Sequence, residues 1–340
     1  MNQQWQQFLT DNGAQVTDTA DLGFAGDNQL APDNALCALT GQAVLRVTGH
    51  DATDFLQGQF SNDVTALASP GSQLTTWSSP KGRVLVLLRL YRDESGYLIV
   101  LPAEQVEAFV KRLRMYVLMA KVVVEEQPQL VCLGLGGRSV GDVVSKSLND
   151  APSDIDTCIS HGDTIATRVR GTVPRFEIIA PVETACELWS AWSEDCQPCG
   201  ESVWRLQNID AGVPGIANAT SEAFVLQMLN LQHIDGVSFK KGCFPGQEVV
   251  ARMQYLGKLK RRMYRAAGTG DDLPVPGDDV YNESTASAVG KVVDAQAVGD
   301  GTYRMLAVCA IAAAEKPLFL EPEARRSLEL LDLPYSLEAG

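Results

Sequence analysis

At positions 240–248 the sequence reads Lys240-Lys241-Gly242-Cys243-Phe244-Pro245-Gly246-Gln247-Glu248. The two glycines and the proline predict a tight loop, because glycine adopts turn conformations closed to other residues and proline restricts its own backbone. A cysteine on such a loop, two residues from an ammonium group, can acquire thiolate character. The amide of Gln247 and the carboxylate of Glu248 can hold a polar heterocycle. A simpler alternative stays open, in which a turn precedes a helix N-terminus and Cys243 is a small buried residue.

The same region is basic, whereas the chain as a whole is acidic. Residues 240–265 contain eight basic side chains and one acid, so they are +7 in a chain whose formal charge is −14. The remaining residues are −21, which disfavours bulk attraction to a phosphate backbone. A local basic patch suits a carboxylate tail, a phosphate or one edge of an RNA, whereas a solvated basic face is the alternative. The basic residues are Lys240, Lys241, Arg252, Lys258, Lys260, Arg261, Arg262 and Arg265.

Length and composition indicate a globular protein of two or three domains, with 340 residues, 45% of them hydrophobic and 21% charged. The eight cysteines are scattered, which is typical of reduced cytoplasmic proteins rather than of a disulfide framework. With three histidines, no metal site is predicted. We find no secretory signal at the N-terminus and no apolar stretch long enough to span a membrane. We therefore expect a cytoplasmic monomer without membrane contact.

Two further motifs favour structural interpretations. Cys196-Gln197-Pro198-Cys199 has C-x-x-C spacing, but it follows a predicted helix and the acidic pair Glu194-Asp195, and there is no second cysteine pair. A redox or zinc role is therefore disfavoured, and residues 196–200 are interpreted as a break. The run Gly134-Leu135-Gly136-Gly137-Arg138-Ser139 lacks the third glycine of a dinucleotide-binding loop and predicts a strand-to-helix turn.

Hydrophobic periodicity predicts an α+β protein. Helices are expected at residues 5–9, 51–59, 106–117, 140–148 and 184–192, a buried strand at residues 83–91, and further strands around residues 43–47, 96–101, 130–135, 164–168 and 175–179. From about Met263 onward, short valine-rich runs alternate with Gly/Asp/Pro turns, which predicts a small barrel or sandwich. Trp204 lies on a predicted helix ended by Gly212, where it can stack on a flat ring or fill a core.

Several motifs together resemble the YgfZ family of folate-binding proteins, relatives of the glycine-cleavage aminomethyltransferase or T-protein. The resemblance extends over almost the whole chain and is strongest in residues 236–252, which include the Lys-Gly-Cys-aromatic-x-Gly-Gln-Glu signature. The other matching segments are Leu56-Gln57-Gly58-Gln59-Phe60-Ser61-Asn62-Asp63-Val64, Ser79-Pro80-Lys81-Gly82-Arg83, Asn208-Ile209-Asp210-Ala211-Gly212-Val213-Pro214, Leu229-Asn230-Leu231 and Leu333-Pro334-Tyr335-Ser336-Leu337-Glu338.

The resemblance implies a three-domain ring like the T-protein, with tetrahydrofolate near its centre. Residues 1–127 with 201–258 would form the folate-binding domain, residues 128–200 a ferredoxin-like α+β domain, and residues 259–340 a β-barrel. It also implies an accessory function in iron–sulfur cluster assembly or repair and in tRNA modification, with iron–sulfur enzymes such as tRNA methylthiolation enzymes as partners. By position, Cys243 would be the essential thiol. The folate-binding residues would be Trp204, Lys241, Gly242, Gly246, Gln247, Glu248 and Arg252.

One departure from the T-protein concerns its catalytic aspartate. No acid lies between Gly82 and Asp93, where the T-protein needs a carboxylate to position the amine and the folate. Aminomethyl transfer is therefore disfavoured, and whether the chain is an enzyme stays open. Two alternatives remain: a folate-dependent one-carbon enzyme such as an aminomethyltransferase or demethylase, and a tRNA-binding module that uses residues 258–265.

Overall fold

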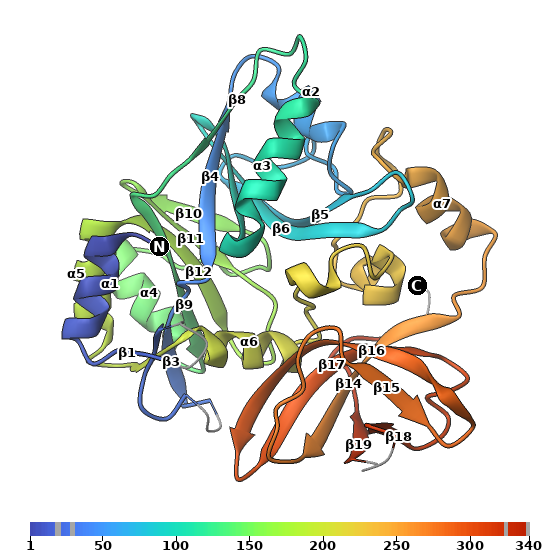
Figure 1. Ribbon diagram of the computed structural model, residues 1–340. Coiled ribbons are helices and arrows are strands. Elements are labelled where there is room, and N and C mark those ends of the chain that lie inside the picture. Colours follow the sequence, from blue (N-terminus) through green and yellow to red (C-terminus); the bar gives the residue numbers. More distant parts are fainter. Residues whose placement is uncertain (18–21, 28–30, 323–325, 338–340) are drawn as a thin grey trace. The chain divides into compact units, whose positions relative to one another are not determined.

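The computed structural model describes residues 1–17, 22–27, 31–322 and 326–337 (Figure 1), so Glu338 of the C-terminal motif lies outside the described residues. By its internal packing the chain divides into two units. Unit 1 comprises Met1–Leu56, Val64–Leu74 and Leu88–Gln207, and unit 2 comprises Gln57–Asp63, Thr75–Leu87 and Asn208–Gly340. The three domain boundaries expected from the family resemblance remain predictions.

Unit 1 contains a six-stranded sheet in which neighbouring strands are antiparallel, except for the parallel pair β3–β13 at one edge. Helices α1 (Gln3–Asp11), α4 (Val140–Leu148) and α5 (Val182–Trp192) pack on it through a core that includes Trp5, Trp189 and Trp192. The strand order is β10 (Cys158–His161), β11 (Thr164–Arg168), β12 (Arg175–Pro181), β9 (Leu130–Gly137), β3 (Asn34–Ala38) and β13 (Gln197–Cys199).

A second sheet has the order β5 (Gly71–Ser78), β6 (Val84–Asp93), β7 (Gly96–Pro102), β4 (Gln42–Thr48) and β8 (Val123–Glu126). The division between the units passes through β5 and β6. The remaining elements of unit 1 are α2 (Ala52–Gln57), α3 (Val106–Met115), the short strands β1 (Gln15–Val16) and β2 (Leu22–Gly23), and the 3-10 turn η1 (Ala103–Gln105). Helix α6 (Glu201–Asp210) begins in unit 1 and ends in unit 2.

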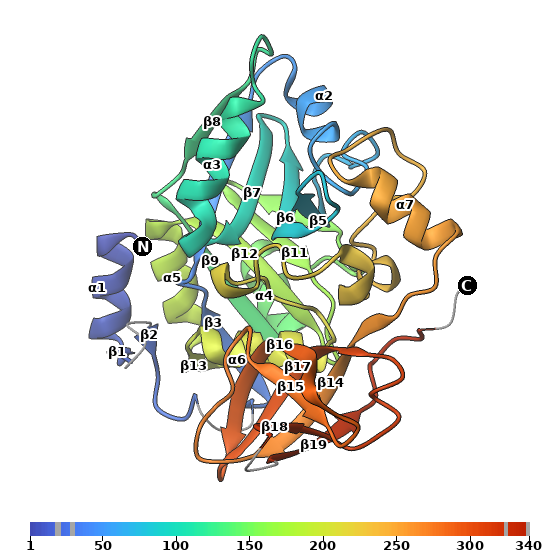
Figure 2. The same cartoon turned by 45° about the vertical axis from the view of Figure 1, so that its right-hand side comes forward.

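Unit 2 ends in a closed six-stranded barrel, which confirms the predicted C-terminal barrel (Figure 2). Its core includes Val292, Tyr303, Met305 and Leu318. The barrel order is β14 (Arg261–Thr269), β17 (Thr302–Ala310), β16 (Thr285–Gly299), β15 (Asp279–Asn282), β18 (Leu318–Leu320) and β19 (Arg326–Leu331). Before the barrel come the 3-10 turns η2 (Asn218–Thr220), η3 (Leu226–Leu229) and η4 (Leu231–His233), and helix α7 (Gln247–Tyr255).

The α+β class is confirmed, and two local interpretations were wrong. Residues 196–200 are not only a break, because Gln197–Cys199 forms the edge strand β13. Three residues show no hydrophobic period, and the partner strand β3 lies about 160 positions earlier in the chain. The glycines at 134 and 136 lie inside β9 rather than in a turn. Among the described residues, no helix is both long and apolar enough to cross a bilayer.

Candidate functional site around Cys243

Residues 236–248 are fastened to the segment 57–63 within unit 2. The hydroxyl of Ser61 donates to the carbonyl oxygen of Gly236 at 2.9 Å, and its backbone carbonyl accepts from the N–H of Ser238 at 3.1 Å. The amide nitrogen of Asn62 donates to the carbonyl oxygen of Asp235 at 2.7 Å. These bonds explain why the Leu-Gln-Gly-Gln-Phe-Ser-Asn-Asp motif accompanies the cysteine loop, although 175 positions separate Ser61 from Gly236.

Lys241 forms the strongest anchor of the loop. Its ammonium group donates to the carbonyl oxygens of Gln57 at 2.6 Å, Phe60 at 2.5 Å and Asn62 at 3.1 Å, and lies 5.3 Å from the ring centroid of Phe244. Burial lowers the pKa of Lys241 to about 8, so the protonated form still predominates at pH 7. Three carbonyls match the three N–H donors of an ammonium. Lys241 therefore ties the loop to the end of α2 and the turn that follows it.

Two glycines bring the Ser79–Arg83 turn against the start of α7. Gly246 has φ +83° and Gly82 has φ +70°, conformations that glycine adopts without strain. A Cβ on Gly246 would lie 2.5 Å from the Cα of Gly82 and 2.6 Å from the carbonyl oxygen of Ser79. A Cβ on Gly82 would lie 3.0 Å from the Cβ of Val249. The two motifs thus need glycine because their backbones touch.

Cys243 is exposed, whereas the next residue, Phe244, is buried. The simpler sequence-based alternative is therefore half right: a helix N-terminus does follow the turn, but the cysteine is not buried. A Cβ on Gly242 would meet nothing within 4 Å, so the backbone beside Cys243 faces open space. Glycine at such a position permits close approach of a ligand or a partner to the main chain.

The other predicted loop residues lie on α7. Gln247 is the first helical residue, and its side-chain amide donates to the carbonyl oxygen of Lys241 at 3.5 Å. Glu248 is exposed in the first turn, where a carboxylate interacts favourably with the helix dipole. Arg252 is exposed in the last turn, which favours a cation for the same reason.

Trp204 is buried in unit 1, with 5% of its surface exposed. The guanidinium carbon of Arg175 lies 3.7 Å from its ring centroid, a close cation–π contact. A Cβ on Gly134 would lie 2.5 Å from Cε3 of the indole, and one on Gly136 would lie 2.2 Å from Oε1 of Gln207. The glycines that resembled a dinucleotide loop therefore make room for α6. The predicted folate contact of Trp204 remains a prediction.

A second buried group in unit 2 explains three more of the matching motifs. Gly212 follows α6 and has φ +65°. Its carbonyl oxygen accepts a hydrogen bond of 2.9 Å from the hydroxyl of Tyr335. Asn230 donates through its side-chain amide to the carbonyl of Met263 at 2.9 Å and to the Tyr335 hydroxyl at 3.4 Å. These contacts join the C-terminal motif to the end of α6 and to the first barrel strand.

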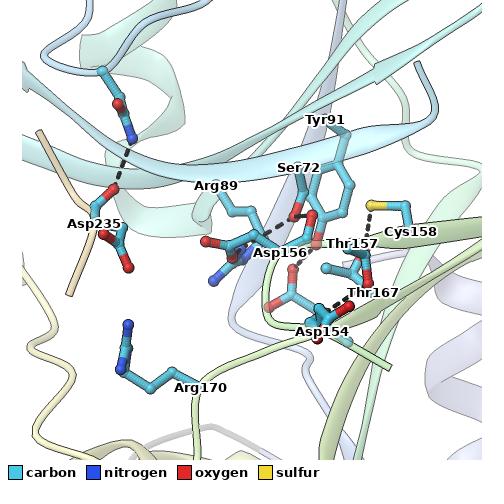
Figure 3. A network of polar contacts seen from close by, with 12 residues as sticks. Ser72, Arg89, Tyr91, Asp154, Asp156, Thr157, Cys158, Thr167, Arg170 and Asp235 are labelled. Atoms are coloured by element: carbon cyan, nitrogen blue, oxygen red, sulfur yellow. Dashed lines mark hydrogen bonds and ion pairs between the residues drawn. The ribbon is translucent and has the colours of Figure 1, made fainter. Parts of the chain in front are cut away.

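Sequence reasoning missed a polar network in unit 1, drawn in Figure 3. Arg89 pairs with Asp156, and its guanidinium also donates to the hydroxyl of Ser72 at 3.2 Å. The hydroxyl of Tyr91 donates to Glu177. Burial, reinforced by the nearby Glu177 carboxylate, raises the pKa of Tyr91 well above its ordinary value. Arg89 and Tyr91 alternate with leucines in β6, and this period of two within an apolar run was the available signal.

Within residues 1–17, 22–27, 31–322 and 326–337, no group of three or more His, Cys, Asp or Glu side chains is arranged to hold a metal ion. Cys199 lies opposite Cys37 in the β13–β3 register, and both are buried. Burial raises the pKa of Cys37 well above its ordinary value.

Comparison with known proteins places this geometry in a family. No protein-family model matches the chain. It is 30% identical over 305 residues to the tRNA-modifying protein YgfZ of Yersinia enterocolitica, which covers 89% of this chain and 92% of that protein. The chain belongs to the YgfZ family. The protein of the same name from Yersinia pseudotuberculosis matches over the same length at the same identity, so the predicted family membership is confirmed.

The fold of this YgfZ-family chain also has a neighbour among solved structures. Aminomethyltransferase T of the glycine cleavage system from Bartonella henselae superposes with a TM-score of 0.74, covering 98% of this chain and 97% of that one. The sequence identity is 14%, so the likeness is one of fold. It confirms the T-protein-like fold expected from the sequence.

Proposed function

We propose that the chain binds tetrahydrofolate beside the Cys243 loop and assists iron–sulfur enzymes, among them enzymes of tRNA modification, in the cytoplasm. Membership of the YgfZ family, whose relatives are named as tRNA-modifying proteins, supports the link to tRNA. The fold shared with aminomethyltransferase T supports a folate ligand. The observation that contributes most is the exposed Cys243, on a loop that Lys241 anchors by hydrogen bonds and that packs at Gly246 against the Ser79–Arg83 turn.

The residues present in unit 2 fit a folate. Its pterin ring is a polar heterocycle with several N–H donors, and its glutamate tail is anionic. Gln59 Oε1 and Ser79 Oγ are buried without a hydrogen-bond partner in the described part of the chain, and an unsatisfied buried polar atom costs about 1–3 kcal/mol. A bound pterin would satisfy such atoms. Arg252, exposed and without an acidic partner among the described residues, can pair with a carboxylate of the tail.

We assign the remaining predicted contacts by position. Gln247 and Glu248 offer an amide and a carboxylate to the pterin, Gly242 and Gly246 give the loop its shape, and Lys241 holds the loop in place. The folate contact predicted for Trp204 rests on its sequence position alone, because most of its surface is covered within unit 1. When bound, tetrahydrofolate supplies a carrier for a one-carbon unit.

The thiol of Cys243 supplies the chemistry that the chain itself contributes. A thiolate is the form of cysteine that binds iron and exchanges with other sulfur groups. Aminomethyl transfer is not proposed, because the residues after Gly82 are the buried apolar side chains of β6, Val84, Leu85, Val86 and Leu87. A carboxylate near the reacting amine is thus not supplied by this strand.

The role of Cys243 is tested by complementation of a strain that lacks its own YgfZ-family gene. We expect Cys243→Ala to leave methylthio-modified nucleosides and iron–sulfur enzyme activity at the level of the deletion strain. Cys186→Ala, which removes a partly exposed thiol from α5, should restore both. Full restoration by Cys243→Ala would reject the role of the thiol.

Folate binding is tested separately by calorimetry with tetrahydrofolate. We expect one molecule bound per chain, with at least about 5-fold weaker binding for Arg252→Ala because a charge-assisted hydrogen bond is lost. Trp204→Phe is measured beside it, together with its thermal melting curve, so that a folding defect is recognised. Absence of binding to the wild-type chain would remove folate from the proposal. Release of formaldehyde or methylene-folate from amine donors would favour a one-carbon enzyme instead.

A further inference from the structure

Helix α7 and the segment that connects it to β14 are seen in Figure 1, and five exposed cations lie on these elements, just before them or at the start of β14. In the part of the chain that the structure describes, none of them has an acidic partner, although the chain has 42 acidic and only 28 basic residues. Other cations of unit 2 are paired: Arg304 with Asp210 at 2.6 Å, and Lys291 with Asp279 at 2.7 Å. The unpaired five are Lys240, Arg252, Lys258, Lys260 and Arg261.

The structure revises the basic patch expected from the sequence. Lys241 is buried against three carbonyl oxygens, and Arg265 donates to the carbonyl of Asp210 at 3.0 Å and faces its carboxylate at 3.6 Å. Neither is available to a ligand. Arg252, in the last turn of α7, stays on the exposed surface, as the sequence pattern predicts. The exposed charge therefore lies on the residue before Lys241, on α7, on the linker after it and on the first residue of β14.

Two apolar side chains lie among these cations. Tyr255 is 69% exposed and Leu256 is 86% exposed, at the C-terminal end of α7. Arg252, Tyr255 and Leu256 have helical spacings of three and four, so they share one face. Phe239 contacts the Tyr255 ring edge-on, with centroids 6.3 Å apart and planes at 71°. This contact holds the ring while most of it stays in solvent.

We propose that this surface, the α7–β14 surface, binds a single-stranded segment of RNA. Proteins that bind single-stranded nucleic acids combine two kinds of group. Cations lie along the phosphate backbone, and an aromatic ring stacks on a base. The choice of RNA over another polyanion rests on the proposed function in tRNA modification. Because α7 has nine residues, its length is about 13 Å. RNA bound at the Tyr255 end would therefore lie about one helix length from the loop of Cys243.

Fluorescence anisotropy with the full-length protein tests this surface. The probes are an RNA hairpin with a seven-nucleotide loop and an RNA duplex of equal charge, each at 50 and 200 mM salt. We expect tighter binding to the hairpin, about 5- to 150-fold weaker binding for Tyr255→Ala, and near-wild-type binding for Tyr255→Phe. The triple variant Lys258→Ala/Lys260→Ala/Arg261→Ala should lower the slope of log K against log salt by about 2.

Three controls keep the outcomes distinct. Lys111→Ala removes an exposed lysine from α3 and should leave the affinity unchanged. Cys243→Ala should also bind RNA normally, so that a failure of the proposed thiol function is separable from a failure of RNA binding. Equal affinity for duplex and hairpin, or no effect of Tyr255→Ala, would overturn the proposal. Displacement of the RNA by poly-glutamate at equal charge concentration would indicate an acidic protein as the partner and would overturn it too.

Discussion

Two cysteine-containing segments of this chain precede helices, and their thiols differ in burial. In residues 196–204, Cys196 and Cys199 are buried, and Trp204 on α6 is covered by Arg175. In residues 240–252, Cys243 is exposed before α7, while the neighbouring Phe244 is buried beside the ammonium of Lys241. Each segment has a cation against an aromatic ring, but only the second leaves its sulfur accessible.

Cysteine spacing is therefore a poor guide to whether a thiol is exposed. The C-x-x-C segment has the more familiar motif, yet Gln197–Cys199 pairs with β3 and becomes part of a sheet. The lone Cys243 lies on a loop whose anchors, Lys241 and Gly246, face inward and leave the thiol outside. Backbone pairing of β13 with β3 buries the C-x-x-C segment. The side-chain contacts of Lys241 hold the other loop so that its thiol, Cys243, stays exposed.

Removal of an aromatic ring should give the largest difference. Trp204→Ala deletes a buried indole that packs on Arg175, so we expect a loss of about 3–5 kcal/mol in the free energy of unfolding. Tyr255→Ala deletes an exposed ring from α7 and should change it by less than about 0.5 kcal/mol. Urea denaturation followed by circular dichroism measures both. Similar losses for the two variants would contradict the assigned burial of Trp204.

Lys241 and Lys240 allow the anchor of the loop to be tested with adjacent residues of the same type. Lys241→Met leaves three carbonyl oxygens, one of them buried and two partly buried, without their donor, and we expect a loss of about 2–4 kcal/mol. Lys240→Met changes an exposed side chain and should stay within about 0.5 kcal/mol. Denaturation at pH 7 compares them. If Lys241→Met left the free energy of unfolding unchanged, other contacts would suffice to hold the loop.

The thiols should differ in reactivity with pH. Burial, reinforced by the Asp195 carboxylate, raises the pKa of Cys196 to about 11, so its thiolate fraction at pH 8 is roughly 200-fold below that of an ordinary cysteine. Iodoacetamide at pH 8 should therefore label Cys243 and leave Cys196 unmodified, as read by peptide mass spectrometry. Raising the pH to 10 should accelerate labelling of Cys196.

The raised pKa of Cys196 also makes the stability of the folded chain depend on pH. The folded chain keeps the Cys196 proton between the ordinary pKa and about 11, whereas the unfolded chain releases it. The contribution of Cys196 to stability is therefore present below pH 8.5 and lost as the pH rises toward 11. Cys196→Ser, measured between pH 8 and pH 10, should lose this dependence. A wild-type profile that matches the variant would contradict it.

The smallest expected difference concerns the two glycines of the loop. Gly246→Ala puts a Cβ against Gly82 and forces a positive φ on alanine, so we expect a loss of about 1–3 kcal/mol. Gly242→Ala meets no atom within 4 Å and should change the stability by less than about 0.5 kcal/mol. Thermal melting ranks the pair. A larger loss for Gly242→Ala would reveal packing that the described residues do not show.

A helix with a clear hydrophobic period was predictable, whereas two strands with distant partners were not. The helix at Val140–Leu148 matches the prediction at both ends, because its apolar residues recur at spacings of three and four. Strands β3 and β13 were missed, since each is stabilised by a partner distant in the sequence. For the candidate site, the sequence identified the loop residues but could not show that Lys241 is buried and Cys243 is not.

The sequence by itself determined the family, the α+β class, the C-terminal barrel and the segment that contains the candidate thiol, because these depend on motifs and on local periodicity. Only the tertiary structure decided which charges and thiols reach solvent. Lys240 and Lys241 are adjacent and chemically identical, yet one is exposed and the other donates to three carbonyl oxygens from the segment 57–62. Burial depends on what distant segments place around a side chain, and that arrangement is absent from the local sequence pattern.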